Sequence, residues 1–270
     1  MKRHYQKNWK RVVIKIGTNS IMNDFKSVDF RKMDRLAYVC ASLIQEGIEV
    51  LLVSSGAIGV GAQVLGLDTY PSDIPDQQAV AAVGQVRLME HYHRFFQYYG
   101  QFIAQVLLTK DIFEFENSYR NTVQSLSKLL EKGILPIVNE NDVVSDDEMN
   151  HVTKFGDNDT LSSLVADMLG ADLLILLSDV DALYTGNPKE DPQAEKVLHV
   201  KEITPDIKAM AQGKGSEFAS GGMATKLGAA QRMLDADKSM VIASGADPDI
   251  IFDIMAGQEV GTLFSRRDQR

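Results

Sequence analysis

The sequence predicts an α/β protein in which helices cover both faces of a mainly parallel sheet of about eight strands. Short apolar runs alternate with longer segments of helical periodicity along most of the 270 residues. The expected strands are mostly apolar runs and not alternating ones, as is typical of strands that are buried on both faces. Neither a tandem repeat nor a low-complexity linker interrupts the pattern. We therefore expect one domain over residues 1–270.

The first half of the chain alternates four expected strands with three expected helices. Strands are expected at residues 12–16 (VVIKI), 49–53, 102–108 and 134–138, and helices at 29–46, 77–99 and 117–132. Each expected helix ends at a glycine, namely Gly47, Gly100 or Gly133. Glycine suits the left-handed conformation that follows the last turn of many helices, so these ends support the assignment.

The second half continues the alternation. Helices are expected at residues 160–169, 226–235 and 248–255, and strands at 173–177 (LLILL) and 240–243. The run 173–177 bears no charge on either face, which indicates a central strand. The segment 206–222 is polar and contains several glycines, so we expect it to be a mobile loop.

The composition favours a soluble globular protein, with 44% apolar and 24% charged residues. The net charge of -9 argues against nucleic acid as a partner. No apolar run approaches the roughly 20 residues that span a bilayer, so no membrane partner is expected. Residues 1–10 are basic and precede no signal-peptide segment, so they are expected to form a loose arm.

Cys40 is the only cysteine, so an internal disulfide is impossible. This cysteine usage fits a reducing cytosol, and we expect a cytoplasmic protein. Cys40 stands within the apolar helical run RLAYVCASL, which favours a buried, inert thiol over a nucleophile. The five histidines show no metal-ligand spacing with it, and no zinc pattern is present.

Lys15 stands near the end of the first expected strand, two residues before Gly17. A charge in a buried strand is costly unless it faces a ligand or an acid. Gly17, Thr18 and Asn19 then form a turn whose N–H groups suit an anion. Lys15 either contacts a phosphate or is a strand-edge lysine that reaches solvent.

The run from Ser54 to Gly61 (SSGAIGVG) leads from the second strand into a helix. Small residues let a ligand approach the backbone, and a helix N-terminus favours anions. The run is neither a Walker A loop nor a dinucleotide fingerprint, because Val64 occupies the place of the third glycine. A tight turn without a ligand is the alternative.

Three polar clusters follow expected strands or precede an expected helix. Asn139, Glu140, Asn141 and Asp142 (NEND) close the strand 134–138, where amide and carboxylate groups suit an ammonium group. Asp157, Asn158 and Asp159 (DND) precede a helix, and Ser178, Asp179 and Asp181 follow the strand 173–177. Carboxyl ends of parallel strands and adjacent helix N-termini are where open α/β sheets bind ligands.

The run SGGMATK, residues 220–226, is a glycine-containing segment that ends in Lys226 at an expected helix start. A cation at a helix N-terminus opposes the macrodipole, which points to an anionic ligand nearby. An ordinary surface lysine is the alternative. Two lysines, two glycine-rich runs and several acids at the ends of one sheet are the parts that phosphoryl transfer requires.

Several segments together resemble the glutamate 5-kinases of the amino acid kinase family. They are, in order, VVIKIGTNSI, VSSGAIGVGAQVLG, AAVGQVRLMEHY, LLTKDIF, ILPIVNENDVV, FGDNDTLSSLVADMLGADLLILLSDVDALYTGNP and SGGMATKLGAA. The resemblance extends from residue 12 to residue 264. The motifs GDND, NEND and GGMATK are specific to this kinase within the family.

The resemblance implies an αβα sandwich and ATP-dependent phosphorylation of the γ-carboxylate of L-glutamate, the first step of proline biosynthesis. Cofactors are then ATP and Mg²⁺, with the metal held mainly by ATP. By family match, the catalytic residues are Lys15, Lys226 and Asp159; the substrate-binding residues are Ser55, Gly56, Ala57, Asn139, Asp142 and Asn158; and the nucleotide-binding residues are Lys15, Ser178, Asp179, Ser220, Gly221, Gly222, Met223, Ala224, Thr225 and Lys226.

The family also implies a homo-oligomer, a tetramer or dimer, with proline as a feedback inhibitor. We expect proline to overlap the glutamate site near Ser55 and a mobile segment after Gly61. Many members carry a C-terminal PUA domain, and we expect the form without it because the chain stops soon after Phe264. Ala182 departs from the glycine that is usual there, and Asp181 is expected to be a turn residue.

Two other functions remain open on the sequence. The first is a related kinase for acetylglutamate, aspartate, carbamate or a nucleoside monophosphate. Asp142 disfavours acetylglutamate, because it suits a free α-ammonium group. The second is an amino-acid sensor that binds without turnover, which the presence of both Lys15 and Lys226 disfavours.

Overall fold

The computed structural model describes residues 9–23, 27–145, 157–188, 190–210 and 222–266. The strands are β1 Arg11–Ile16, β2 Met22–Asn23, β3 Ser27–Val28, β4 Glu49–Ser54, β5 Ile103–Leu108, β6 Leu135–Glu140, β7 Leu173–Ser178, β8 Leu183–Tyr184, β9 Lys196–Val197, β10 His199–Val200, β11 Ser239–Ser244 and β12 Thr262–Phe264. The helices are α1 Thr18–Ile21, α2 Phe30–Gln45, α3 Ala57–Leu65, α4 Ile74–Tyr98, α5 Glu116–Glu131, α6 Asn158–Met168, α7 Pro205–Met210, α8 Met223–Asp235 and α9 Ile250–Met255, with a 3₁₀ turn η1 at Lys110–Phe113.

Eight of these strands form one sheet in the order β10-β12-β11-β7-β1-β4-β6-β5, which confirms the predicted class and strand number. Two small sheets, β2-β3 and β8-β9, accompany it. The chain forms two compact units. The terminal unit comprises residues 1–15 and 156–270, and the central unit comprises residues 16–155. That they make one domain stays a prediction.

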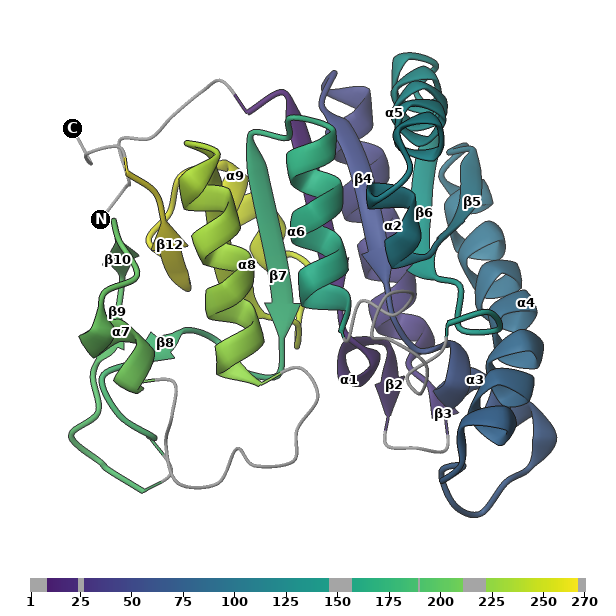
Figure 1. Ribbon diagram of the computed structural model, residues 1–270, viewed down its shortest axis with the longest axis horizontal. Helices are drawn as coiled ribbons and strands as arrows, with labels where there is room; N and C mark the ends of the chain where they lie inside the picture. The colour runs from purple at the N-terminus through teal and green to yellow at the C-terminus, as the bar shows by residue number, and fades with distance from the viewer. Residues whose placement is uncertain (1–8, 24–26, 146–156, 189, 211–221, 267–270) are drawn as a thin grey trace. The chain divides into compact units, whose positions relative to one another are not determined.

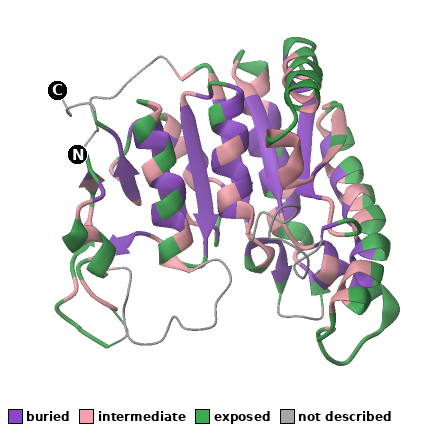
Figure 2. Cartoon of the chain, in the orientation of Figure 1, coloured by how far each residue is buried: buried purple, intermediate pink, exposed green. Residues whose placement is uncertain are grey.

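In the terminal unit, β11 runs parallel to β7, and Ser244 pairs with Ser178 at their carboxyl ends. β12 is antiparallel to β11 and parallel to β10. Helices α6 and α8 pack side by side in front of β7, with α9 behind (Figure 1). Figure 2 shows β7 buried along its length, as expected for an uncharged run. This arrangement brings the N-termini of α6 and α8 to the carboxyl edge of the strands.

Helix α8 begins three residues earlier than the sequence predicts, at Met223 instead of Lys226. Gly222 takes the N-cap position in extended conformation, so Lys226 lies inside the helix. The expectation of a mobile loop over residues 206–222 is wrong at its start, because Pro205–Met210 forms α7. Residues 211–221 of that segment lie outside the described residues.

The N-terminal arm is also shorter than expected. The backbone N–H groups of Lys10 and Arg11 donate to Asp172 Oδ2 at 2.8 and 3.1 Å. These bonds fix residue 10 beside the sheet, so the expectation of a loose arm is wrong there. Residues 1–8 of the arm lie outside the described residues.

In the central unit, β4, β6 and β5 are parallel, and Val53 pairs with Val138 near their carboxyl ends. Figure 1 shows α5 in front of β4 and β6 and α2 behind them. Helix α4 begins at Ile74, three residues before the predicted start, because Asp73 caps it by accepting from Asp76 N at 2.9 Å. Residues 61–65 belong to α3, so the segment after Gly61 begins as helix and not as a mobile stretch.

Two glycines explain how closely α3 and α4 pack. A Cβ on Gly84 of α4 would stand 1.8 Å from Ala57 O, and one on Gly61 of α3 would stand 2.0 Å from Val80 O. Both distances are far below a van der Waals contact, so neither position accepts a side chain at this spacing. Helix α4 is thereby seated directly on the helix that follows β4.

Cys40 is fully buried in α2, and burial raises the pKa of its thiol to about 12. A thiol with this pKa stays protonated at neutral pH. The burial of Cys40 was expected, and its inertness stays a prediction. Within the described ranges, no helix is long and apolar enough to cross a membrane.

Candidate active site

Lys15, Asp159 and Lys226 form a buried cluster in the terminal unit. Lys15 Nζ lies 2.7 Å from Asp159 Oδ1, and Lys226 Nζ lies 3.1 Å from Asp159 Oδ2. Asp159 is 0% exposed, Lys226 4% and Lys15 8%. The structure thus brings together the three residues predicted as catalytic.

Each of the three side chains is positioned by the end of an element. Lys15 is the last residue but one of β1, Asp159 lies in the first turn of α6, and Lys226 is the fourth residue of α8. Helix α6 begins where it does because Asp157 accepts from Thr160 N at 2.8 Å. The preceding residue of α8, Thr225, also donates to Asp159 Oδ2, at 3.2 Å.

The charge of this cluster is only partly balanced. Burial alone would raise the pKa of Asp159, but the ammonium groups of Lys15 and Lys226 outweigh it and hold this pKa below its usual value. Asp159 is therefore ionised at neutral pH. These three side chains taken by themselves, two cations and one anion, carry one net positive charge. This charge suits an anionic ligand.

The N-terminus of α8 offers donors beside the cluster. Gly222 caps α8 without a side-chain hydrogen bond among the described residues, and the uncapped N-terminus of a helix suits an anion. The predicted nucleotide positions Gly222, Met223, Ala224 and Thr225 lie at this N-cap and in the first turn. Ser220 and Gly221 lie outside the described residues.

Ser178 is the last residue of β7, one residue beyond the predicted end, and Asp179 follows it at the same edge. Ser178 Oγ donates to Asp179 Oδ1 at 2.9 Å, so the two side chains orient each other. Asp181 forms an ion pair with Lys196 at 2.5 Å and accepts from Tyr184 Oη at 3.0 Å. Asp181 therefore ties the turn after β7 to the small sheet β8-β9, beyond the turn role that was expected.

In the central unit, the predicted residues Ser55, Gly56 and Ala57 lie between β4 and α3. Gly56 has a φ of 106°, a left-handed conformation that favours glycine. Ser55 N donates to Ile16 O at 3.2 Å. The residue before them is also fixed, because Ser54 Oγ and Tyr92 Oη lie 2.7 Å apart in a buried hydrogen bond.

The predicted Asn139 and Asp142 lie at the carboxyl end of β6 and in the turn that follows it. β6 extends two residues beyond its predicted end, so Asn139 and Glu140 belong to the strand and are buried. Asn139 Nδ2 donates to Gln85 Oε1 at 2.9 Å. Because β4 and β6 are parallel neighbours, this turn and Ser55 end at the same edge of the central unit.

Asn158, the remaining predicted substrate residue, is the first residue of α6 in the terminal unit, whereas the other five lie in the central unit. Among the residues that the structure describes, no group of three or more His, Cys, Asp or Glu side chains is placed to hold a metal ion.

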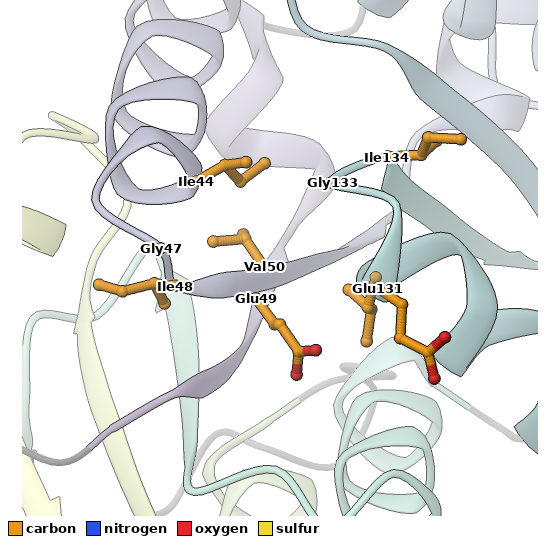
Figure 3. A pocket seen from close by; sticks show the side chains of 9 residues that line it. Ile44, Gly47, Ile48, Glu49, Val50, Glu131, Gly133 and Ile134 are labelled. Atoms are coloured by element: carbon orange, nitrogen blue, oxygen red, sulfur yellow. The ribbon is translucent and has the colours of Figure 1, made fainter.

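A cavity of about 270 Å³ lies elsewhere in the central unit (Figure 3). It is lined by Ile44, Gly47, Ile48, Glu49, Val50, Leu130, Glu131, Gly133 and Ile134. Glu49 begins β4, so this cavity lies at the amino end of that strand, opposite Ser54 and Ser55. It is therefore separate from the predicted site.

Sequence reasoning missed two residues that contact the predicted substrate turn. Gln85 of α4 bonds Asn139, and Gln78 of the same helix donates to Ser145 O at 2.9 Å. The partners are 54 and 67 residues apart in the chain, so no local pattern connects them. The only signal was the shared face of Gln78 and Gln85, which are seven residues apart on one helix.

Residues 10–244 match the amino acid kinase family. The chain is 52% identical over 263 residues to a protein named glutamate 5-kinase from Listeria innocua serovar 6a, covering 97% of this chain and 95% of the relative. A glutamate 5-kinase of Lactiplantibacillus plantarum is 51% identical over 94% of this chain and 96% of its own length.

Solved structures of other kinases share the fold. Carbamate kinase from Giardia lamblia bound to AMP-PNP superposes with a TM-score of 0.67 at 17% identity, over 95% of this chain and 98% of that one. Isopentenyl phosphate kinase from T. acidophilum gives a TM-score of 0.64 at 17% identity, over 94% of this chain and 99% of that one. At this identity the two structures establish the fold alone.

Proposed function

Since the chain belongs to the amino acid kinase family and is a kinase, we propose that it transfers the γ-phosphoryl group of ATP to the γ-carboxylate of L-glutamate. The products are γ-glutamyl phosphate and ADP, in the first step of proline biosynthesis. The observation that carries the proposal is the buried cluster of Lys15, Asp159 and Lys226 with its net positive charge. The identity to proteins named glutamate 5-kinase supports the choice of acceptor.

The main obstacle to this reaction is the repulsion between two anions. A carboxylate oxygen of glutamate attacks the γ-phosphorus, and the bond from that phosphorus to the β-phosphate bridging oxygen breaks as ADP leaves. The carboxylate is already ionised at neutral pH, so no general base is required. Lys15 and Lys226 offset the charge of the transferring group, and Asp159 holds both ammonium groups in position.

Recognition of glutamate is assigned to short polar side chains. Asp142 suits the α-ammonium group, and Asn158 and Asn139 offer amide donors to carboxylate oxygens. Gly56 and Ala57 bring backbone N–H groups and Ser55 brings a hydroxyl to the end of β4, where small residues allow close approach. An acetylated acceptor would lack the cation that Asp142 pairs with.

Nucleotide binding is assigned to the carboxyl edge of the terminal unit. The N-terminus of α8 with Lys226 faces the phosphates, and Ser178 and Asp179 lie at the carboxyl end of β7. Mg²⁺, held mainly by the phosphates of ATP, would lower the charge of the transferring group. Asp179 is an oxygen donor of the kind that this ion accepts.

The test is a panel of acceptors with ATP and Mg²⁺, in which ADP release is followed by a coupled assay. L-Glutamate should give turnover far above N-acetylglutamate, aspartate, carbamate and UMP. A preference for any of these would reassign the acceptor. Binding of glutamate with zero ADP release would instead favour an amino-acid sensor.

Substituting Lys15 or Lys226 by alanine should reduce kcat on the order of 10²-fold or more. Each lysine is proposed to act on charge that develops in the transition state, so the KM for ATP should change less. Steady-state kinetics with varied ATP measure both parameters. Unchanged kcat with a raised ATP KM would assign the lysine to ground-state binding alone.

Proline should inhibit competitively with glutamate, at a site that overlaps Ser55 and the helix that contains Gly61. Glutamate kinetics at several proline concentrations test this expectation, and a glutamate KM independent of proline would contradict it. We also expect the enzyme to form a dimer or tetramer, and light scattering can measure the molar mass of the assembly. A cytoplasmic location is expected as well, in line with the single reduced cysteine.

A further inference from the structure

The turn that carries Asp142 is held at both ends by one helix. At its start, Asn139 Nδ2 donates to Gln85 Oε1 at 2.9 Å. At its end, Gln78 Nε2 donates to Ser145 O at 2.9 Å. Gln78 and Gln85 are two helical turns apart on one face of α4, so the two attachment points are about 10 Å apart along the helix.

The direction of both hydrogen bonds is fixed by the partners. Asn139 Oδ1 accepts from the backbone N–H of Glu140 at 2.9 Å, so the Asn139 amide must present its NH₂ group to Gln85. Gln85 therefore acts as an acceptor. The partner of Gln78 is a backbone carbonyl, so Gln78 must act as a donor.

The turn is also closed on itself. Ser145 Oγ donates to Glu140 Oε1 at 3.0 Å, and Ser145 N donates to Asn141 O at 3.2 Å. Asn139, Glu140 and Ser145 are all buried. A closed turn that is attached to a long helix at both ends has few other conformations, so the backbone at Asp142 is fixed.

Helix α4 is itself a rigid support. Gly84, next to Gln85, seats α4 directly on Ala57 of α3, the helix that follows Ser55 and Gly56. A shift of α4 would therefore move both groups of central-unit residues that are assigned to glutamate. Binding residues must be held to within about 0.5 Å for full affinity.

We infer that Gln78 and Gln85 are positioning residues that set the affinity for the amino-acid substrate by holding the Asn139–Ser145 turn. They act through Asn139 and Ser145 and do not touch the transferring phosphoryl group. The inference rests on the proposed role of Asn139 and Asp142 in glutamate binding. It adds a helix face to a site that is otherwise built from strand ends.

The test compares methionine and glutamate substitutions at the two positions. Gln85→Met and Gln78→Met keep the length of the side chain and remove the hydrogen bond. Each should raise the glutamate KM about 3- to 10-fold, as expected for one lost hydrogen bond. The kcat should stay within about 3-fold, and the KM for ATP should not change.

The glutamate variants separate the two roles. Gln85→Glu keeps an acceptor and should stay within about 2-fold of the parent KM, whereas Gln78→Glu loses its donor and should behave like Gln78→Met. Both variants add one negative charge, so a difference between their glutamate KM values reflects the loss of the donor at Gln78. Gln97→Met and Gln97→Glu are the matched controls, because Gln97 is an exposed glutamine of the same helix.

Hydrogen exchange gives a readout that does not need catalysis. Amides of residues 139–145 should exchange faster in Gln78→Met and Gln85→Met than in the parent and the Gln97 controls. Unchanged exchange together with an unchanged glutamate KM would overturn the inference. Absence of ADP release from the parent enzyme would refute the proposed function instead, and the exchange result would still decide whether the glutamines position the turn.

Discussion

At the scale of single residues, Asp159 is the side chain on which the candidate site depends. It is fully buried and contacts two buried ammonium groups, those of Lys15 and Lys226. Breaking a buried ion pair by removing one partner costs about 3–5 kcal/mol. We therefore expect Asp159 to stabilise the fold in addition to its proposed catalytic role, and the pH dependence of unfolding can test its contribution to stability.

Asp159→Asn should lower the free energy of unfolding by about 3 kcal/mol at pH 7. The pKa of Asp159 is lowered in the folded state, so its stabilisation is present above the unfolded value near pH 4 and is lost as pH falls through the folded value. The difference between parent and variant should therefore shrink below pH 4. Urea unfolding at several pH values measures the difference in the free energy of unfolding between the parent and Asp159→Asn.

Asp235→Asn is the matched control for this substitution. Asp235 pairs with Arg266 at 3.0 Å, but both side chains are exposed. An exposed pair contributes about 0–1 kcal/mol. If Asp235→Asn were as destabilising as Asp159→Asn, or if the Asp159→Asn deficit persisted at pH 2, the ionised cluster would not be the source of the effect.

At the scale of elements, the contact between α3 and α4 depends on the absence of a side chain at Gly84. Gly84→Ala should destabilise the protein by about 2–3 kcal/mol, because the new Cβ would meet Ala57 O. Thermal or urea unfolding measures the change. The glutamate KM should rise as well, since α4 supports the turn with Asp142.

The same substitution at Gly228 serves as the control. Gly228 lies on the exposed side of α8, where a Cβ would meet no described atom within 4 Å. Replacing glycine by alanine in such a helix position stabilises by about 0.5–1 kcal/mol. If Gly84→Ala lowers the free energy of unfolding and Gly228→Ala raises it, then packing, and not helix propensity, decides the effect at Gly84.

The sequence predicted most elements and many of their ends. Apolar runs such as LLILL and the glycines that follow helices are local signals, and β7 and α2 formed as expected. Helix α8 was placed too late, because the glycine before it was interpreted as loop instead of N-cap. The two-residue strands β8 and β9 carry no periodicity. Thr262 connects them by accepting from Leu183 N and donating to Val197 O.

The candidate site was predictable only in part. Lys15 was marked by a charge within an apolar strand. The partnership of Lys226 with Asp159, 67 residues away, followed from family resemblance and not from any spacing. The contacts of Gln78 and Gln85 had no counterpart in the sequence, because they depend on how α4 lies against β6.

At the scale of the whole molecule, Cys40 can report on opening of the core. Its thiol is buried with a pKa raised to about 12, so a thiol reagent at pH 8 should not react with the native protein. Reaction should begin as urea unfolds the chain, and ATP with glutamate should shift it to higher urea. Because the chain has one cysteine, the signal has a single origin.

Rapid labelling of the native protein at zero urea would contradict this expectation. It would mean that α2 opens locally, without global unfolding. Comparing the urea dependence of labelling with that of circular dichroism distinguishes local opening of α2 from global unfolding. Coincident transitions support a cooperative core, and an earlier labelling transition would locate a weak element.

The sharing of one carboxylate by Lys15 and Lys226 has a consequence for the end of the catalytic cycle. ADP and an acyl phosphate are both anions, and two uncompensated ammonium groups would retain them strongly. In the proposed reaction, Asp159 would halve the excess charge of the two lysines, so it would limit the affinity for products while it keeps the lysines in position. The carboxylate that assembles the site thus also favours product dissociation, which is often the slowest step of an enzyme of this kind.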